Sequence, residues 1–90
     1  MPRYMIEREF PDGLNIPMTE AGAQACRHVC DNNLEFGVTW IFSYVTPDRK
    51  RTFCIYDGPS PEAIRRAADS NKLPVTRITE VRVLDPYFFR

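Results

Sequence analysis

The chain has 90 residues, of which 43% are hydrophobic and 12% aromatic, and its twelve basic and twelve acidic side chains leave no net charge. This length predicts a single domain over residues 1–90, and the composition excludes a disordered chain. Zero net charge argues against a nucleic-acid or anionic-membrane partner, and no apolar run reaches the length of a bilayer span. Because three cysteines fit a reducing compartment better than a disulfide framework, we expect a cytoplasmic protein.

The first strand is predicted over residues 3–10, where side chains alternate, and the turn sequence Pro11-Asp12-Gly13 ends it. A helix follows from about residue 19 to residue 32, with Thr19 as its N-cap and Glu20 at the positive end of the helix dipole. The spacing i, i+4, i+8 defines its expected inward stripe. That stripe comprises Ala21, Ala25 and Val29, with Gly22 and Cys26 beside it.

Two runs rich in β-branched and aromatic residues, 38–46 and 51–56, flank the turn at 47–50 and predict a hairpin. A second helix begins after Ser60, which can cap it. Pro61 occupies the first helical position, where its missing N–H costs nothing. The apolar stripe of this helix is expected to be Ala63, Ile64, Ala67 and Ala68.

A last strand is predicted over residues 75–84, followed by an aromatic tail at 87–90. The resulting order is β-α-β-β-α-β, which is typical of an α+β, ferredoxin-like fold with a four-stranded antiparallel sheet and two helices on one face. A domain this small buries only about 60–65% of its unfolded surface. We therefore expect a homodimer in which two sheets pack as an α+β barrel, and the tail either clasps the partner or frays.

Both alternating sets of side chains in the hairpin are apolar, so its faces are assigned by chemistry. Phenol and indole rings carry a polar atom that suits a cavity or interface, which favours the aromatic-rich set for the open face. A one-residue slip in register would reverse the faces of the third strand. The helix-side set is Ile41, Val45, Phe53 and Ile55; the open-face set is Trp40, Phe42, Tyr44, Cys54 and Tyr56.

Cys54 is the first candidate for a chemical role, because it is expected mid-sheet beside tyrosines. With Glu7 and Glu80 it would complete a polar cavity wall, and Cys54 with Glu7 would offer a thiolate and a carboxylate to a divalent metal. The alternative is that Glu7 and Glu80 form ion pairs along strand edges, with Arg8, Arg77 or Arg82.

Other site types have weaker support. Cys26, His28 and Cys30 alternate along one helix, and His28 lies about 200° round from Cys26, so core filling is favoured over ligation. With one histidine and no glycine-rich loop, neither a nucleophile–histidine pair nor a phosphate loop is indicated. An RNA-recognition motif shares the order of elements, but residues 51–56 lack its glycine and the charge is neutral.

Several segments together resemble a bacterial family of small proteins, most of them without an assigned function, that includes a nickel-binding protein with a dimeric ferredoxin-like fold. The segments are 6–11, Ser43-Tyr44-Val45, 51–56, 59–65, Leu73-Pro74 and 78–81. The resemblance implies that the chain binds a divalent metal such as nickel. Many relatives carry histidine where this chain has Phe42 and Ala67, and neither side chain can replace imidazole as a ligand.

The sequence thus leaves three functions open. The first is metal binding at an altered site, and the second is binding of a small apolar ligand at Trp40, Phe42 and Tyr44, as in dimeric α+β barrels that include cofactor-independent oxygenases. The third is an assembly module without a ligand. The predicted cavity residues are Glu7, Trp40, Phe42, Tyr44, Cys54, Tyr56 and Glu80.

Overall fold

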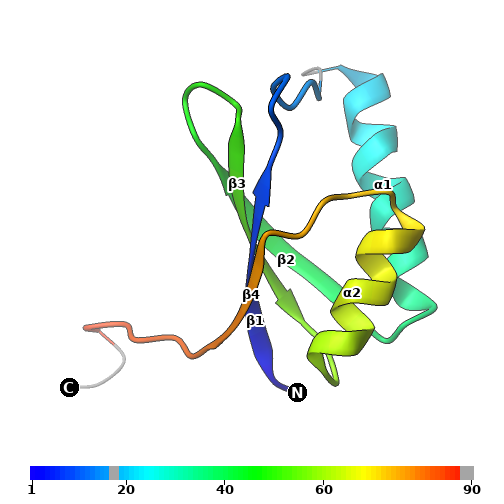
Figure 1. The fold of residues 1–90 in the computed structure, drawn as a ribbon. Coiled ribbons are helices and arrows are strands. Elements are labelled where there is room, and N and C mark those ends of the chain that lie inside the picture. Colours follow the sequence, from blue (N-terminus) through cyan, green and yellow to red (C-terminus); the bar gives the residue numbers. More distant parts are fainter. Residues whose placement is uncertain (17–18, 88–90) are drawn as a thin grey trace.

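The structure is a computed structural model that describes residues 1–16 and 19–87 (Figure 1). It confirms the predicted order of elements. The last strand is shorter than the predicted 75–84, and Phe88 and Phe89 of the predicted tail lie outside the described residues. The elements are β1 (Arg3–Glu9), α1 (Glu20–Leu34), β2 (Thr39–Val45), β3 (Arg51–Asp57), α2 (Pro61–Ser70) and β4 (Arg77–Val81).

The four strands form one sheet in the order β2-β3-β1-β4, with every neighbouring pair antiparallel. Figure 1 shows α1 and α2 on the same side of this sheet. The sheet therefore has a helix side and an open face, as the ferredoxin-like fold requires. None of the described helices is long and apolar enough to span a membrane.

The core lies between the sheet and α2. The predicted stripe of α2 is confirmed, because Ala63, Ile64, Ala67 and Ala68 are all buried. The predicted cap is also present: the Ser60 hydroxyl accepts a hydrogen bond of 3.2 Å from the backbone N–H of Ala63. The core cluster is completed by Tyr4, Ile6, Val38, Cys54 and Tyr56.

The inward stripe of α1 differs from the prediction. Ala21 and Ala25 are exposed, whereas Gly22 and Asn33 are buried and Cys26 and Val29 are half-buried. The buried positions follow the spacing i, i+4, i+7, i+11, so the helix is rotated by about one residue from the predicted stripe. Thr19 stands at the N-cap as predicted, but its side chain makes no capping hydrogen bond.

A β-bulge at Ile41 interrupts the alternation of side chains along β2, and the sequence pattern does not predict this interruption. Trp40 pairs with Tyr56 of β3, but Phe42 pairs with Ile55, so Ile41 is an extra residue between two pairs. Cross-strand partners share a face of the sheet. Trp40 therefore belongs to the helix side, and the side chains that follow the bulge change parity.

The predicted faces of β3 are reversed in the structure. Cys54 and Tyr56 pair with Ile6 and Tyr4 of β1, and all four side chains are buried against the helices. Phe53 and Ile55 are half-buried and belong to the open face. The prediction failed here because both sets are apolar, so that only pairing with β1 fixes the orientation.

Candidate functional site

The residues predicted to line one cavity are divided between the two faces of the sheet. Glu7 pairs with Phe53, and Tyr44 pairs with the same residue from the other side, so these side chains share the open face with Phe42. The remaining predicted residues, Trp40, Cys54, Tyr56 and Glu80, belong to the helix side. The single cavity wall that combined all seven residues is therefore wrong.

The open face carries an exposed aromatic pair. Phe42 and Tyr44 are 45% and 65% exposed, and their rings meet edge to face with 5.2 Å between centroids. Phe53, Ile55 and Met5 extend this apolar surface as half-buried neighbours on the central strands. Two predicted aromatic residues thus lie where a partner or ligand can reach them.

Glu7 places a carboxylate beside this apolar surface. Its side chain is 25% exposed, and its Oε2 atom lies 3.6 Å from Nε of Arg77 on β4. The ion pair is the alternative that the sequence left open for Glu7, and Arg77 is the partner. Exposed pairs of this kind contribute little to stability, so the Glu7 carboxylate can exchange Arg77 for another cation at small cost.

The helix-side residues form part of a packed interior. Trp40 stacks on Tyr56 with 6.4 Å between ring centroids, and its indole N–H donates a hydrogen bond of 2.9 Å to the Ser43 hydroxyl. The Cys54 thiol is 6% exposed and donates to the Thr52 hydroxyl at 3.5 Å. These contacts account for Trp40 and Cys54 as core residues.

Glu80 lies across from Tyr4 at the edge strand, on the helix side and exposed. Burial raises the pKa of the Tyr4 phenol, and the negative charges of Glu80 and Glu62 raise it further. Glu80 therefore lies at the edge of the core, on the helix side, and not on the open face.

The described residues of the chain do not fit the predicted metal site. Cys54 and Glu7 point to opposite faces of the sheet and cannot bind one ion together. Within residues 1–16 and 19–87, no three histidine, cysteine, aspartate or glutamate side chains are grouped as metal ligands. Phe42 and Ala67, the two positions at which the resemblance implied histidine in relatives, supply no donor atom to a metal ion.

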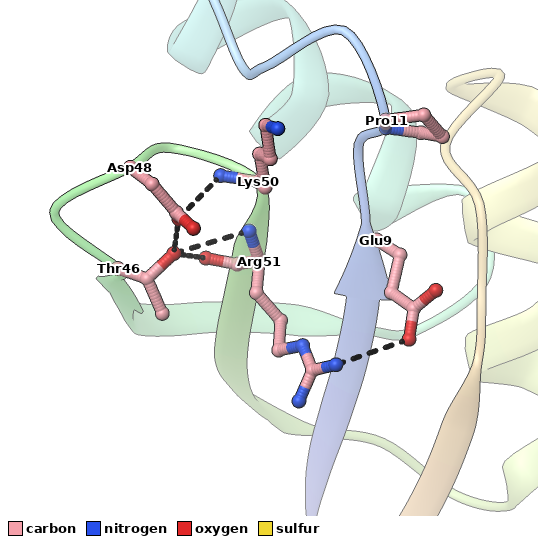
Figure 2. Close-up of a pocket in the computed structure, with 6 residues that line it drawn as sticks. All are labelled: Glu9, Pro11, Thr46, Asp48, Lys50 and Arg51. Carbon is pink, nitrogen blue, oxygen red and sulfur yellow. Dashed lines mark hydrogen bonds and ion pairs between the residues drawn. The ribbon is translucent and has the colours of Figure 1, made fainter.

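The structure has a polar pocket of about 520 Å³ at the turn between β2 and β3 (Figure 2). Asp48 folds back into the turn, where its Oδ1 accepts hydrogen bonds from the Thr46 hydroxyl at 2.7 Å and the Lys50 N–H at 3.0 Å. These two hydrogen bonds hold the pKa of Asp48 below its usual range, and the bond from Thr46 has the larger effect. The pocket is lined by Glu9, Pro11, Thr46, Asp48, Lys50 and Arg51.

The polar side chains of this pocket are engaged mainly with one another. Figure 2 shows Arg51 reaching across to Glu9 of β1, at an N–O distance of 3.5 Å. Arg49, within the turn, has a positive φ of 61°, which is uncommon for a residue with a Cβ atom. We therefore interpret the pocket as part of the turn that joins the two strands of the predicted hairpin.

A second pocket, of about 490 Å³, opens at the other end of β1. Its main feature is a bidentate ion pair, in which Arg3 Nε and Nη2 donate hydrogen bonds of 2.8 and 3.2 Å to the Asp57 carboxylate. Hydrogen bonding to Arg3 is the largest cause of the lowered pKa of Asp57. This pair fastens β1 to β3.

A buried polar group on the helix side was not predicted. Arg8 on β1, Asn33 on α1 and Thr52 on β3 are at most 3% exposed, so all three are buried between the sheet and the helices. One signal for Arg8 was present in the sequence, because strand parity places it on the same face as Tyr4 and Ile6.

One solved structure with the same fold is the crystal structure of SCO4226 from Streptomyces coelicolor A3(2). The two chains superpose with a TM-score of 0.72 and 19% sequence identity, over 92% of this chain and 99% of the other. At this identity the likeness establishes the fold alone. No curated protein matches the chain.

A family model supplies the stronger relationship. Residues 4–81 match the model described as "Nickel responsive protein SCO4226-like". The match extends from the second residue of β1 to the last residue of β4, and so includes every helix and strand. The protein belongs to the SCO4226-like family.

Proposed function

We propose that this protein is a nickel-responsive binding protein that works as a homodimer, with the open faces of two sheets packed together. The family description supports the response to nickel. The observation that carries the dimer is the exposed aromatic pair of Phe42 and Tyr44, which forms an apolar surface next to half-buried Phe53 and Ile55. Three free cysteines fit our further proposal of a cytoplasmic location.

Glu7 is the residue that we propose as a contact for the metal ion. Its carboxylate borders the apolar surface, and its present partner Arg77 is largely exposed. Packing two open faces together would bring the Glu7 carboxylates of both copies into the same interface, where an ion would relieve their repulsion. Cys54 has no part in this proposal, because its thiol belongs to the interior.

Native mass spectrometry of the full chain tests both elements of the proposal. The protein is measured alone and after titration with nickel or zinc, as the wild type and as Glu7→Gln. Glu80→Gln is the matched control, since it removes a carboxylate from the other face of the sheet. We expect a dimer that takes up nickel in a fixed ratio, and we expect the Glu7 variant alone to lose it. A monomer contradicts the dimer, and equal uptake by both variants contradicts the role of Glu7.

The second candidate function is binding of a small apolar molecule between the two sheets. The edge-to-face pair of Phe42 and Tyr44 favours it, because such rings offer both an apolar surface and a phenol hydroxyl. A fluorescent apolar dye should bind the wild-type dimer more tightly than Tyr44→Ala. A dimer that takes up neither metal nor dye would instead have a purely structural role in assembly.

A further inference from the structure

The chain leaves the sheet after β4 as an exposed segment. The ladder between β4 and β1 ends at the pair of Val81 and Arg3. Beyond that pair, Val83 and Leu84 are 59% and 85% exposed. Figure 1 shows the segment, in orange to red, running away from the sheet on the side opposite the helices. It therefore carries two apolar side chains out on the side of the open face.

The strand at the other edge of the sheet can accept a further strand. In the order β2-β3-β1-β4, β2 is an end strand whose pairing is with β3. Edge strands of native proteins commonly carry charged residues or proline, which deter pairing with another chain, but β2 has neither. After the bulge, regular pairing with β3 resumes at Phe42 and continues to Val45. Residues 42–45 thus present a regular outer row of backbone N–H and C=O groups.

The segment after β4 matches this edge in length and in chemistry. Pro86 has no backbone N–H and cannot donate to a ladder, so residues 82–85 are the part that can pair. Residues 82–85 and 42–45 are equally long. Both carry exposed apolar side chains, because Phe42 and Tyr44 are 45% and 65% exposed.

One chain cannot bring its own segment to its own β2. To pair outside β2, a segment that starts at Val81 would have to cross four strand spacings, about 19 Å. Residues 82–85 span at most about 14 Å when fully extended. A second copy removes this limit. A two-fold rotation about an axis that lies between two open faces, parallel to the strands, places β4 of each copy opposite β2 of the other.

We propose that residues 82–85 of each copy pair as an added strand with residues 42–45 of the other copy. This contact rests on the proposed dimer and names the element that closes it. Backbone hydrogen bonds would satisfy the outer edge of β2. Successive side chains of a strand point to opposite faces, so either Val83 or Leu84 packs against the exposed Phe42 and Tyr44.

Sedimentation velocity of the full chain tests the contact with the double variant Val83→Glu, Leu84→Glu. A two-fold dimer loses the contact twice, so we expect the dissociation constant to rise by about a hundredfold. The monomer should keep its circular dichroism spectrum, since both residues are exposed. The matched control is Ala25→Glu, Leu34→Glu, which adds the same two charges at exposed positions of α1 and should leave the dissociation constant unchanged.

Hydrogen exchange, measured residue by residue by NMR, separates strand pairing from a contact of side chains alone. In the wild-type dimer, the N–H groups of residues 42–45 that point away from β3 should exchange more slowly than in the monomeric double variant. Equal exchange in the two proteins overturns the pairing.

The outcomes also separate this contact from the proposed function. A wild-type monomer contradicts the dimer and the added strand together. A wild-type dimer that the double variant forms equally tightly overturns the added strand alone, and the proposed packing of open faces then stands.

Discussion

Glu7 and Cys54 lie on adjacent strands one step apart in register, and their side chains point to opposite faces of the sheet. Glu7 is directly across from Phe53, and Cys54 is directly across from Ile6. Since side chains alternate along a strand, one step is enough to separate the carboxylate from the thiol by the thickness of the sheet. A function that uses one of these groups cannot draw on the other.

The first prediction concerns Cys54→Ser. A hydroxyl in place of the buried thiol should cost about 1–3 kcal/mol of unfolding free energy, because the one hydrogen bond described for this position is the bond to the Thr52 hydroxyl. Nickel affinity should not change. Isothermal titration with nickel and chemical denaturation measure the two quantities, and Cys54→Ala separates the loss of the sulfur from the gain of a polar group. A large loss of nickel affinity in both variants would show that the Cys54 thiol is needed for nickel binding.

The second prediction concerns the open face. Phe42→Glu should convert the proposed dimer to a monomer, because it places two charges in an apolar interface. The monomer itself should lose only about 1 kcal/mol or less, since Phe42 is 45% exposed. Sedimentation velocity measures the association. Leu34→Glu is the control: it adds the same charge at a residue of α1 that is 72% exposed, and the dimer should persist.

The third prediction compares two helix caps. Ser60→Ala should destabilise the protein by about 1 kcal/mol, because the Ala63 N–H loses its acceptor. Thr19→Ala should cost less, since the Thr19 side chain makes no capping bond. Urea denaturation of both variants gives the comparison. Equal losses would show that the Ser60 hydroxyl adds nothing beyond local backbone preference.

The fourth prediction is a pH dependence. The pKa of Asp57 is lowered from 3.8, first by the hydrogen bond from Arg3, so the folded protein holds this carboxylate ionised more strongly than the unfolded chain does. The stabilisation is present above the unfolded pKa and is lost as pH falls through the folded value. Asp57→Asn should therefore flatten the stability profile below about pH 4. Unfolding measured from pH 7 to pH 2 checks this, and an unchanged slope in the variant contradicts it.

Much of the fold was predictable because local signals agree with the final structure. Ser60 and Pro61 fix the start of α2, and its four buried residues follow one helical stripe. The order of elements then leaves few arrangements for a chain of this length. The helix α1 was predicted less well, since the small residues at positions 21–23, 25 and 26 fit either of two adjacent stripes.

The candidate site was harder to predict because it depends on register. The bulge at Ile41 has no marker in the residue types around it, and the two sets of β3 are equally apolar. Pairing with Ile6 is what turns Cys54 inward. Arg8 shows a related limit: its parity with Tyr4 indicates burial, yet an arginine on a strand is ordinarily assigned to the surface.

The placement of Trp40 allows its fluorescence to report on the helix side of the sheet. It is the sole tryptophan, and it rests on Tyr56 beneath the helices, near the phenol that Arg8 and Asn33 approach. Indole emission should thus register events beneath the helices and ignore those on the opposite surface. An ion held at Glu7 on the open face should leave the wavelength of the emission unshifted, whereas a change in packing around Tyr56 should move it.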